Sequence, residues 1–138
     1  MREPRLSPPR FSWQYFYLKK MQEADNKATL LKGNAAIAAG DNEGFLSLCT
    51  EDTEWVFYGD ITLKGKEAVR QWMAATYLKP PVVTVDDLIA EDDYLTAVGT
   101  VIMDDADGRP VHHSYADVWR FEGGKMAALR AFVVETNK

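Results

Sequence analysis

The stretch from His112 to Glu135, which reads HHSYADVWRFEGGKMAALRAFVVE, decides the fold of this chain. Two runs rich in β-branched and aromatic residues flank Gly123-Gly124. A pair of glycines suits the positive φ angles that tight hairpin turns require. The pattern therefore predicts a β-hairpin with one long strand on each side of the turn.

The first strand of this hairpin has a carboxylate on its apolar face. Side chains alternate between the two faces of a strand. One face therefore carries Val111, His113, Tyr115, Asp117, Trp119 and Phe121. A carboxylate within an apolar layer is unfavourable unless it is hydrogen-bonded, paired or protonated. Asp117 is the leading candidate for a functional residue, and a structural aspartate bonded to a backbone amide or to a neighbouring side chain is the alternative.

The composition indicates one globular domain and excludes several classes of protein. A chain of 138 residues is long enough to bury roughly two thirds of its unfolded surface. The net charge of -5 argues against non-specific binding to nucleic acid, which needs a basic face. The single cysteine, Cys49, allows no disulfide framework and no thiolate metal site, and it fits a cytoplasmic location. No apolar run approaches the roughly 20 residues of a membrane span.

Residues 1–24 are predicted to form an N-terminal arm or extension ahead of a single domain at residues 25–138. The first 20 residues contain five basic residues, one acid and three of the six prolines, with an aromatic cluster from Phe11 to Tyr17. Three interpretations stay open for this segment. It is an arm that packs on the domain or on a neighbouring subunit, an organelle transit peptide, or an extension ahead of a natural start at Met21.

Hydrophobic periodicity predicts the remaining elements. The expected order is a helix from Asp25 or Asn26 to about Ala39, a short helix after Asp41, a strand at Glu54–Tyr58, a short strand ending near Gly65, a helix at Lys66–Leu78, and strands at Val82–Glu91 and Tyr94–Asp104. This order indicates the α+β class, with helices on one face of a curved sheet. Small residues share the inner face of the sheet with large aromatics, so we expect a pocket under the helices.

Three short motifs, in their order and spacing, resemble the nuclear transport factor 2-like superfamily, and within it the SnoaL-like and ketosteroid-isomerase-like branch. They are Ala39-Gly40-Asp41, Leu63-Lys64-Gly65-Lys66-Glu67 and Tyr115-Ala116-Asp117-Val118-Trp119-Arg120-Phe121. The likeness covers about Asp25 to Asn137. It implies a cone-shaped α+β barrel with three helices packed on a curved, mostly antiparallel sheet, a pocket between these layers, and a homodimer formed through the outer face of the sheet.

The resemblance also implies roles for single residues. The aspartate that hydrogen-bonds the enolate in ketosteroid isomerases falls on Asp117, as does the acid/base aspartate of SnoaL-type cyclases. The proton-shuttling aspartate of the isomerases falls on Phe57, and their oxyanion tyrosine falls on Gly33. Two of the three isomerase groups are therefore absent, which argues against steroid isomerisation by that mechanism.

These observations define a candidate site for a small, largely apolar carbonyl compound. Asp117 is expected to act as acid/base, because burial raises the pKa of a carboxyl group and a neutral acid can hydrogen-bond an oxyanion. His113 and Tyr115 share its face and are expected to assist. The ligand-binding wall is expected to consist of Trp55, Phe57, Trp72, Tyr77, Ala97, Gly99, Trp119, Ala131 and Val133. No Gly-rich phosphate loop or metal-binding histidine spacing appears, so neither a cofactor nor a metal is expected.

Each assignment has a structural alternative. An aromatic residue packs in a core more often than it binds a ligand. His113 can be a satisfied core histidine, and Tyr115 can bond a backbone carbonyl. Alternation turns Tyr58 away from the face of Phe57, and Asp60 is expected to be a turn residue. For the whole chain, the alternatives are a non-catalytic ligand-binding or dimerisation domain and an interaction module with an apolar groove on the outer face of the sheet.

Overall fold

A computed structural model describes residues 12–136 of the chain as three helices and six strands. The helices are α1 (Trp13–Ala38), α2 (Asn42–Leu46) and α3 (Lys66–Thr76). The strands are β1 (Cys49–Phe57), β2 (Thr62–Lys64), β3 (Val82–Glu91), β4 (Tyr94–Asp104), β5 (Pro110–Glu122) and β6 (Lys125–Thr136).

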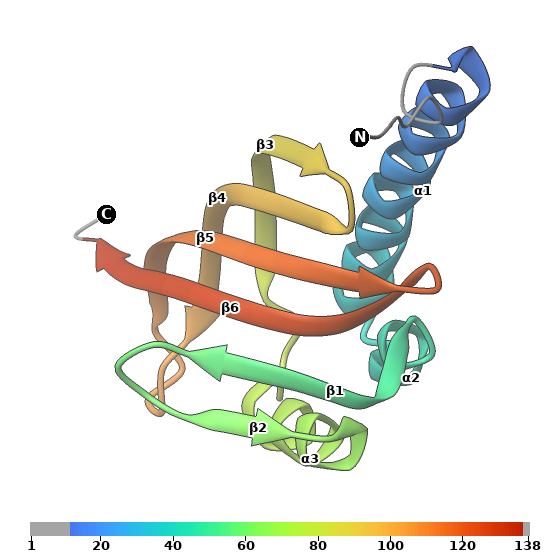
Figure 1. Cartoon of the computed structure of the whole chain (residues 1–138). Coiled ribbons are helices and arrows are strands. Elements are labelled where there is room, and N and C mark those ends of the chain that lie inside the picture. Colours follow the sequence, from blue (N-terminus) through green and yellow to red (C-terminus); the bar gives the residue numbers. More distant parts are fainter. Residues whose placement is uncertain (1–11, 137–138) are drawn as a thin grey trace.

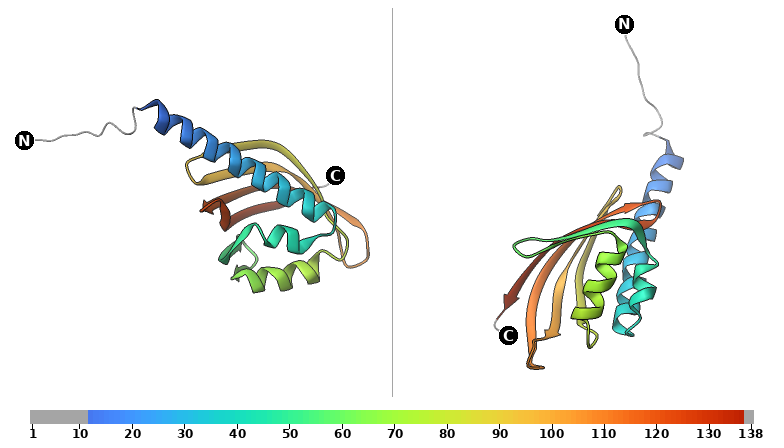
Figure 2. Two further views of the ribbon diagram at one scale, coloured as in Figure 1. Left: turned by 90° about the vertical axis from the view of Figure 1, so that its right-hand side faces the viewer. Right: turned by 90° about the horizontal axis from the view of Figure 1, so that it is seen from below.

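The six strands form one sheet in the order β2-β1-β6-β5-β4-β3. Only β1 and β6 are parallel, and the other neighbours are antiparallel. The sheet curves without closing, with β2 and β3 at its two edges (Figure 1). All three described helices lie on one face of the sheet, which leaves the outer face uncovered (Figure 2). This architecture confirms the expected α+β class, with three helices on a curved and mostly antiparallel sheet.

The β5–β6 hairpin forms as its sequence predicts. Gly123 and Gly124 have φ angles of 58° and 80°. These left-handed conformations strain other residues much more than glycine. Glu122 and Lys125 pair across the turn. Since β4 pairs with the other edge of β5, β5 is an interior strand of the sheet, and Asp117 lies near the middle of this strand.

Helix α1 begins at Trp13, so the prediction that the first helix starts at Asp25 or Asn26 is wrong. Ser12 caps the helix by accepting a hydrogen bond from the backbone amide of Tyr15 at 3.0 Å. Asn26 lies within the helix and is buried, with 1% exposure. A residue that can cap a helix does not start one when the residues before it also favour helix.

The N-terminal turns of α1 extend past the edge of the sheet and contact the turn between β3 and β4 (Figure 1). Lys19 pairs with Asp92. Gln22 donates to the carboxylate of Asp93 at 2.9 Å. The helix thus runs across the predicted domain boundary at residue 24, while the part of the predicted arm at residues 1–11 lies outside the described residues.

Strand β1 begins at Cys49, earlier than the strand that was expected at Glu54. Cys49 and Thr53 are fully buried, each with 0% exposure. The pairing of β1 with β6 shifts register between Cys49 and Glu54. Such an irregularity interrupts the alternation of polar and apolar residues by which a strand is found in a sequence.

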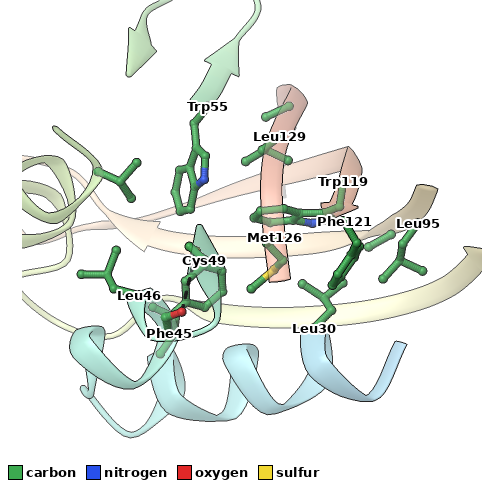
Figure 3. Close-up of a cluster of buried hydrophobic side chains, with 14 of the residues drawn as sticks. Leu30, Phe45, Leu46, Cys49, Trp55, Leu95, Trp119, Phe121, Met126 and Leu129 are labelled. Atoms are coloured by element: carbon green, nitrogen blue, oxygen red, sulfur yellow. Dashed lines mark hydrogen bonds between the residues drawn. The ribbon is translucent and has the colours of Figure 1, made fainter. Parts of the chain in front are cut away.

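The core lies between the helices and the sheet (Figure 3). The ring of Phe45 in α2 lies 5.8 Å from the ring of Trp55 and 6.0 Å from that of Trp119, measured between centroids. Leu30 of α1 and Phe121 of β5 complete the cluster with exposures of 2% and 1%. Burial of each such side chain contributes about 1.5–3 kcal/mol. The cluster therefore holds α1 and α2 firmly on the sheet.

Gly99 of β4 permits a close approach that bends β3. A Cβ atom at this position would lie 1.9 Å from the carbonyl oxygen of Thr84. The pairing of β3 with β4 shifts register between Val85 and Asp87, which marks a β-bulge. The hydroxyl of Tyr115 donates to the same Thr84 carbonyl at 3.1 Å. A glycine, a bulge and a tyrosine on three adjacent strands therefore form one structural unit.

Replacing Gly99 with alanine is expected to lower the free energy of unfolding by about 1–3 kcal/mol, because the added methyl group forces the Thr84 carbonyl away from both strands. Urea denaturation measures this loss. Thr100→Ala is the matched control, since its side chain is exposed on the same strand, and it should cost less than about 0.5 kcal/mol. Equal losses in the two variants would contradict the role assigned to the close approach.

Candidate functional site

A cavity of about 400 Å³ lies between the helices and the inner face of the sheet. All three helices and strands β1, β3, β4, β5 and β6 contribute side chains to its lining. The volume lies within the range of small-molecule sites, which is roughly 300–1,000 Å³. The cavity is therefore large enough for a compact organic molecule.

The cavity brings together most of the residues that the sequence singles out. Those that line it are His113, Tyr115, Asp117, Trp119, Trp55, Phe57, Trp72, Tyr77, Ala97, Ala131 and Val133. Gly99 is not in the lining, because its Cα lies against the carbonyl of Thr84. The roles of these residues in binding or catalysis stay predictions.

The lining also contains polar residues that the sequence did not indicate as site residues. Asp60 follows the end of β1 and reaches the cavity through a turn at Gly59, whose φ is 80°. Tyr58 also borders the cavity, although its ring stacks on that of Phe132. Glu135 lies on the same face of β6 as Val133 and also lines the cavity. The strand alternation contained the signal for Glu135, whereas the inward position of Asp60 depends on the path of the turn.

Asp117 lies on β5 between two alanines. Its neighbour on β4 is Ala97 and its neighbour on β6 is Ala131, both almost completely buried. These short side chains leave space beside the carboxyl group. Asp117 is partly buried, and no described residue forms a hydrogen bond or ion pair with its side chain. Burial raises the pKa of the Asp117 carboxyl to about 7.

Two phenols lie within electrostatic range of Asp117. Burial raises the pKa of Tyr77 well above its usual value, and the charge of Asp117 raises it further. Burial and then the charge of Asp117 raise the pKa of Tyr115 to about 12. The hydroxyl of Tyr115 already donates to the Thr84 carbonyl. Among the described residues no partner is found for the hydroxyl of Tyr77. Tyr77, unlike Tyr115, can therefore donate a hydrogen bond to a ligand without breaking an existing one.

His113 lies four residues before Asp117 on the same face of β5, with Tyr115 between them. Its cross-strand neighbours are Val101 on β4 and Glu135 on β6. The Nδ1 atom is buried, and it has no hydrogen-bond partner within residues 12–136. His112 points to the opposite face by strand alternation, as expected. The site therefore contains a single imidazole.

Aromatic rings form a continuous wall in the lining of the cavity. The ring of Trp72 in α3 lies 6.1 Å from that of Trp55, 5.0 Å from that of Phe57 and 5.3 Å from that of Tyr77, between centroids. Side chains from α3 and β1 thus present ring faces and edges to the interior. Such a surface favours flat, apolar ligands.

The chemistry that this arrangement allows is proton transfer. A carboxyl group with a pKa near 7 is present in both protonation states at neutral pH, so it can donate a proton or accept one.

In residues 12–136 no group of three or more His, Cys, Asp or Glu side chains is arranged to hold a metal ion. Across the same residues, none of the helices is both long and apolar enough to cross a membrane.

Comparison with known proteins places the chain in a family. The model of the SnoaL-like domain matches residues 32–129, which is more than half of the 138 residues. No curated protein matches the chain.

Several solved structures share the fold. An NTF2-like protein from Cytophaga hutchinsonii is 22% identical, and the match covers 82% of this chain and 99% of that chain with a TM-score of 0.65. TerC, co-crystallised with polyporic acid, is 23% identical over 78% of this chain and 89% of its own, with a TM-score of 0.69.

A third structure, an LEH-like epoxide hydrolase from M. tuberculosis, is 11% identical over 81% of this chain and 84% of its own, with a TM-score of 0.73. At these identities the structures show a shared fold and no more. The match of the family model goes further, because it includes all of α2, α3 and β1 to β5, together with the end of α1 and the start of β6. The chain therefore belongs to the family of SnoaL-like domains and has the NTF2-like fold.

Proposed function

We propose that this SnoaL-like domain binds a small, largely apolar carbonyl compound and transfers a proton on it without a cofactor, as an isomerase, cyclase or dehydratase does. The observation that carries the proposal is the carboxyl group of Asp117. It faces a cavity, has no partner among the described residues, and has a pKa raised by burial to about 7. A protein gains nothing in stability from an unpaired buried carboxyl, so a role toward a ligand accounts for it.

Asp117 serves as the acid/base in this proposal. In its neutral form it donates a hydrogen bond to the carbonyl oxygen of the ligand and stabilises the negative charge that develops there. In its ionised form it accepts a proton from the ligand, and the two forms interconvert near pH 7. Tyr77 is a second donor for the carbonyl oxygen, while His113 assists proton transfer from the same strand. The bond from Tyr115 to Thr84 gives Tyr115 a positioning role.

The comparisons support a small-molecule site in this cavity. SnoaL-like and NTF2-like proteins include polyketide cyclases and epoxide hydrolases. One protein of the same fold was crystallised with polyporic acid. The aromatic wall formed by Trp55, Phe57, Trp72 and Tyr77 suits a flat ligand of this general size.

A second candidate function is a non-catalytic ligand-binding domain. The observation that favours it is the identity of two residues at positions where ketosteroid isomerases have functional groups. Phe57 lines the cavity with an apolar ring, and Gly33 lies so close to Phe45 that a Cβ atom would be 2.8 Å from that ring. No hydroxyl could reach the cavity from residue 33 without moving Phe45. Binding without turnover would then be the outcome in the experiments below.

We also propose a homodimer formed through the outer face of the sheet. Tyr58 and Phe132 stack there with centroids 4.6 Å apart, and Phe132 and Val134 are 45% and 64% exposed. No described helix covers this face (Figure 2). Exposed apolar residues gathered on one face are typical of an interface between subunits.

We assign the protein to the cytoplasm, because its single cysteine, Cys49, is a buried free thiol.

The substitution Asp117→Asn is expected to keep the fold and to abolish proton transfer. With acetylnaphthalene as the test ketone, exchange of the hydrogens next to the carbonyl for deuterium is followed by NMR in deuterated buffer. The variant should lose at least about 100-fold in rate, because general acid–base groups contribute roughly 100- to 10,000-fold. Asp52→Asn, which changes an exposed carboxyl on β1, is the control. Equal rates in wild type and Asp117→Asn would refute the assignment, and binding without any exchange would establish the non-catalytic alternative.

The raised pKa of Asp117 also predicts a change in stability with pH. From about pH 4 to about pH 7 the folded protein retains a proton that the unfolded chain releases, so the free energy of unfolding falls as the pH rises. Between these pH values the advantage of Asp117→Asn over wild type should grow by about 3 kcal/mol, since amide burial is independent of pH. Urea denaturation at the two pH values measures the effect. An identical pH dependence in wild type and variant would show that Asp117 is ionised and hydrated in the folded state.

The substitution Phe132→Glu is expected to convert a dimer into a monomer, because it places a charge on the apolar outer face. Light scattering coupled to gel filtration measures the mass in solution. Tyr17→Glu is the control, since Tyr17 is a 69% exposed aromatic on α1, away from the sheet. A wild-type monomer, or a dimer that persists in Phe132→Glu, would disprove the proposed interface.

A further inference from the structure

We propose that the cavity selects its ligand by charge: the ligand carries a basic nitrogen that is protonated at neutral pH, and analogues with a carboxylate or phosphate group are rejected. The inference rests on the proposed function for the carbonyl end of the ligand, which lies beside Asp117. It adds the chemistry of the opposite end, which lies at the mouth of the cavity.

The distribution of charge in the lining is one-sided. Three carboxylates, those of Asp60, Asp117 and Glu135, line the cavity. Among the described residues no lysine or arginine does so, and His113 supplies the only ionisable nitrogen in the lining. A bound anion would lie among these carboxyl groups and would have no lysine or arginine as a partner.

Two of these carboxylates lie at the mouth and one lies inside. Asp60 and Glu135 are exposed, as are their neighbours Tyr58 and Val133, with exposures of 51% and 39%. Asp117 lies deeper, between almost fully buried alanines. A ligand whose carbonyl group reaches Asp117 therefore projects its other end between acidic side chains.

The basic residue adjacent to this region does not reverse the charge. Lys79 follows the lining residue Tyr77 by two positions, and its Nζ forms an ion pair with Asp104 at 2.9 Å. Asp104 in turn follows the lining residue Met103. The pair is neutral overall, and the chain carries a net charge of -5. Both the local and the overall field attract cations and repel anions.

The aromatic wall is part of the same lining as the three carboxyl groups. The rings of Phe57, Trp72 and Tyr77 follow one another at centroid distances of 5.0 and 5.3 Å. Aromatic faces attract cations within about 6 Å. The wall therefore accepts a flat middle section of a ligand and supports a cationic group at its outer end. A carboxylate in the same position would meet the negative faces of these rings.

Binding of three matched ketones tests the proposal. They are acetylnaphthalene and its derivatives with an aminomethyl or a carboxyl group on the far ring, titrated against the full chain by calorimetry. The amine is expected to bind roughly tenfold more tightly than the neutral ketone, and the carboxylate at least tenfold more weakly. Raising the salt concentration from about 20 mM to about 500 mM should reduce both differences, because exposed charges are screened.

A double variant locates the effect. Asp60→Asn combined with Glu135→Gln should remove most of the amine's advantage and of the carboxylate's penalty. The control combines Glu54→Gln with Glu122→Gln, which removes the same charge from exposed residues outside the cavity lining. The control should keep the wild-type ranking, because these carboxylates do not face the ligand.

The outcomes separate this inference from the proposed function. Equal affinities for the three ketones, or tightest binding of the carboxylate, would overturn the charge selection alone. Loss of the ranking in the control variant would also overturn it, because the overall charge would then be its cause. The predicted ranking without any proton exchange on the ketone would support charge selection while refuting catalysis. Failure of all three ketones to bind would overturn both.

Discussion

The desolvation of one carboxyl group is the constraint on which the site depends. Asp117 projects from the middle of the sheet into a cavity where aromatic and small apolar side chains replace water. The carboxyl group is buried, but it still faces the cavity because the neighbouring side chains of Ala97 and Ala131 are too short to cover it. Burial without a partner places its pKa near neutrality, which is the property that acid–base chemistry requires. Larger residues at the two alanine positions would fill the space in which a ligand could bind.

The surrounding structure maintains this space. The helices are fixed at one end of the sheet by the cluster around Phe45, Trp55 and Trp119, so they cannot collapse onto Asp117 (Figure 3). On the opposite side, the close approach at Gly99 bends β3, and the bond from Tyr115 to Thr84 holds that bend. Packing at one end and curvature at the other thus leave the cavity between them. Phe45, Trp55 and Trp119 both hold the helices in place and line the cavity, whereas Gly99 and Thr84 act from outside its lining.

Much of the fold could be predicted from the sequence, because its signals are local. The glycine pair and the alternation in β5 and β6 indicated the hairpin, and β3 and β4 have the expected bounds. The start of α1 could not be predicted, because Asn26 is a good cap by type and lies in the middle of a longer helix. The inward face of Asp117 followed from alternation. The role of Gly99 depends on a neighbouring strand, and the position of Asp60 depends on the path of a turn, so neither had a local signal.

The parallel pairing of β1 with β6 has a consequence for how the chain reaches its final state. β6 is the last strand along the described chain, yet it lies in the interior of the sheet, between β1 and β5. During synthesis, β1 and β2 can pair with each other, but they cannot join the rest of the sheet until β6 has emerged. Contacts between residues so distant in sequence form late and slowly. Until β6 has formed, the apolar side chains of β1 are not covered by the rest of the sheet and are accessible to chaperones.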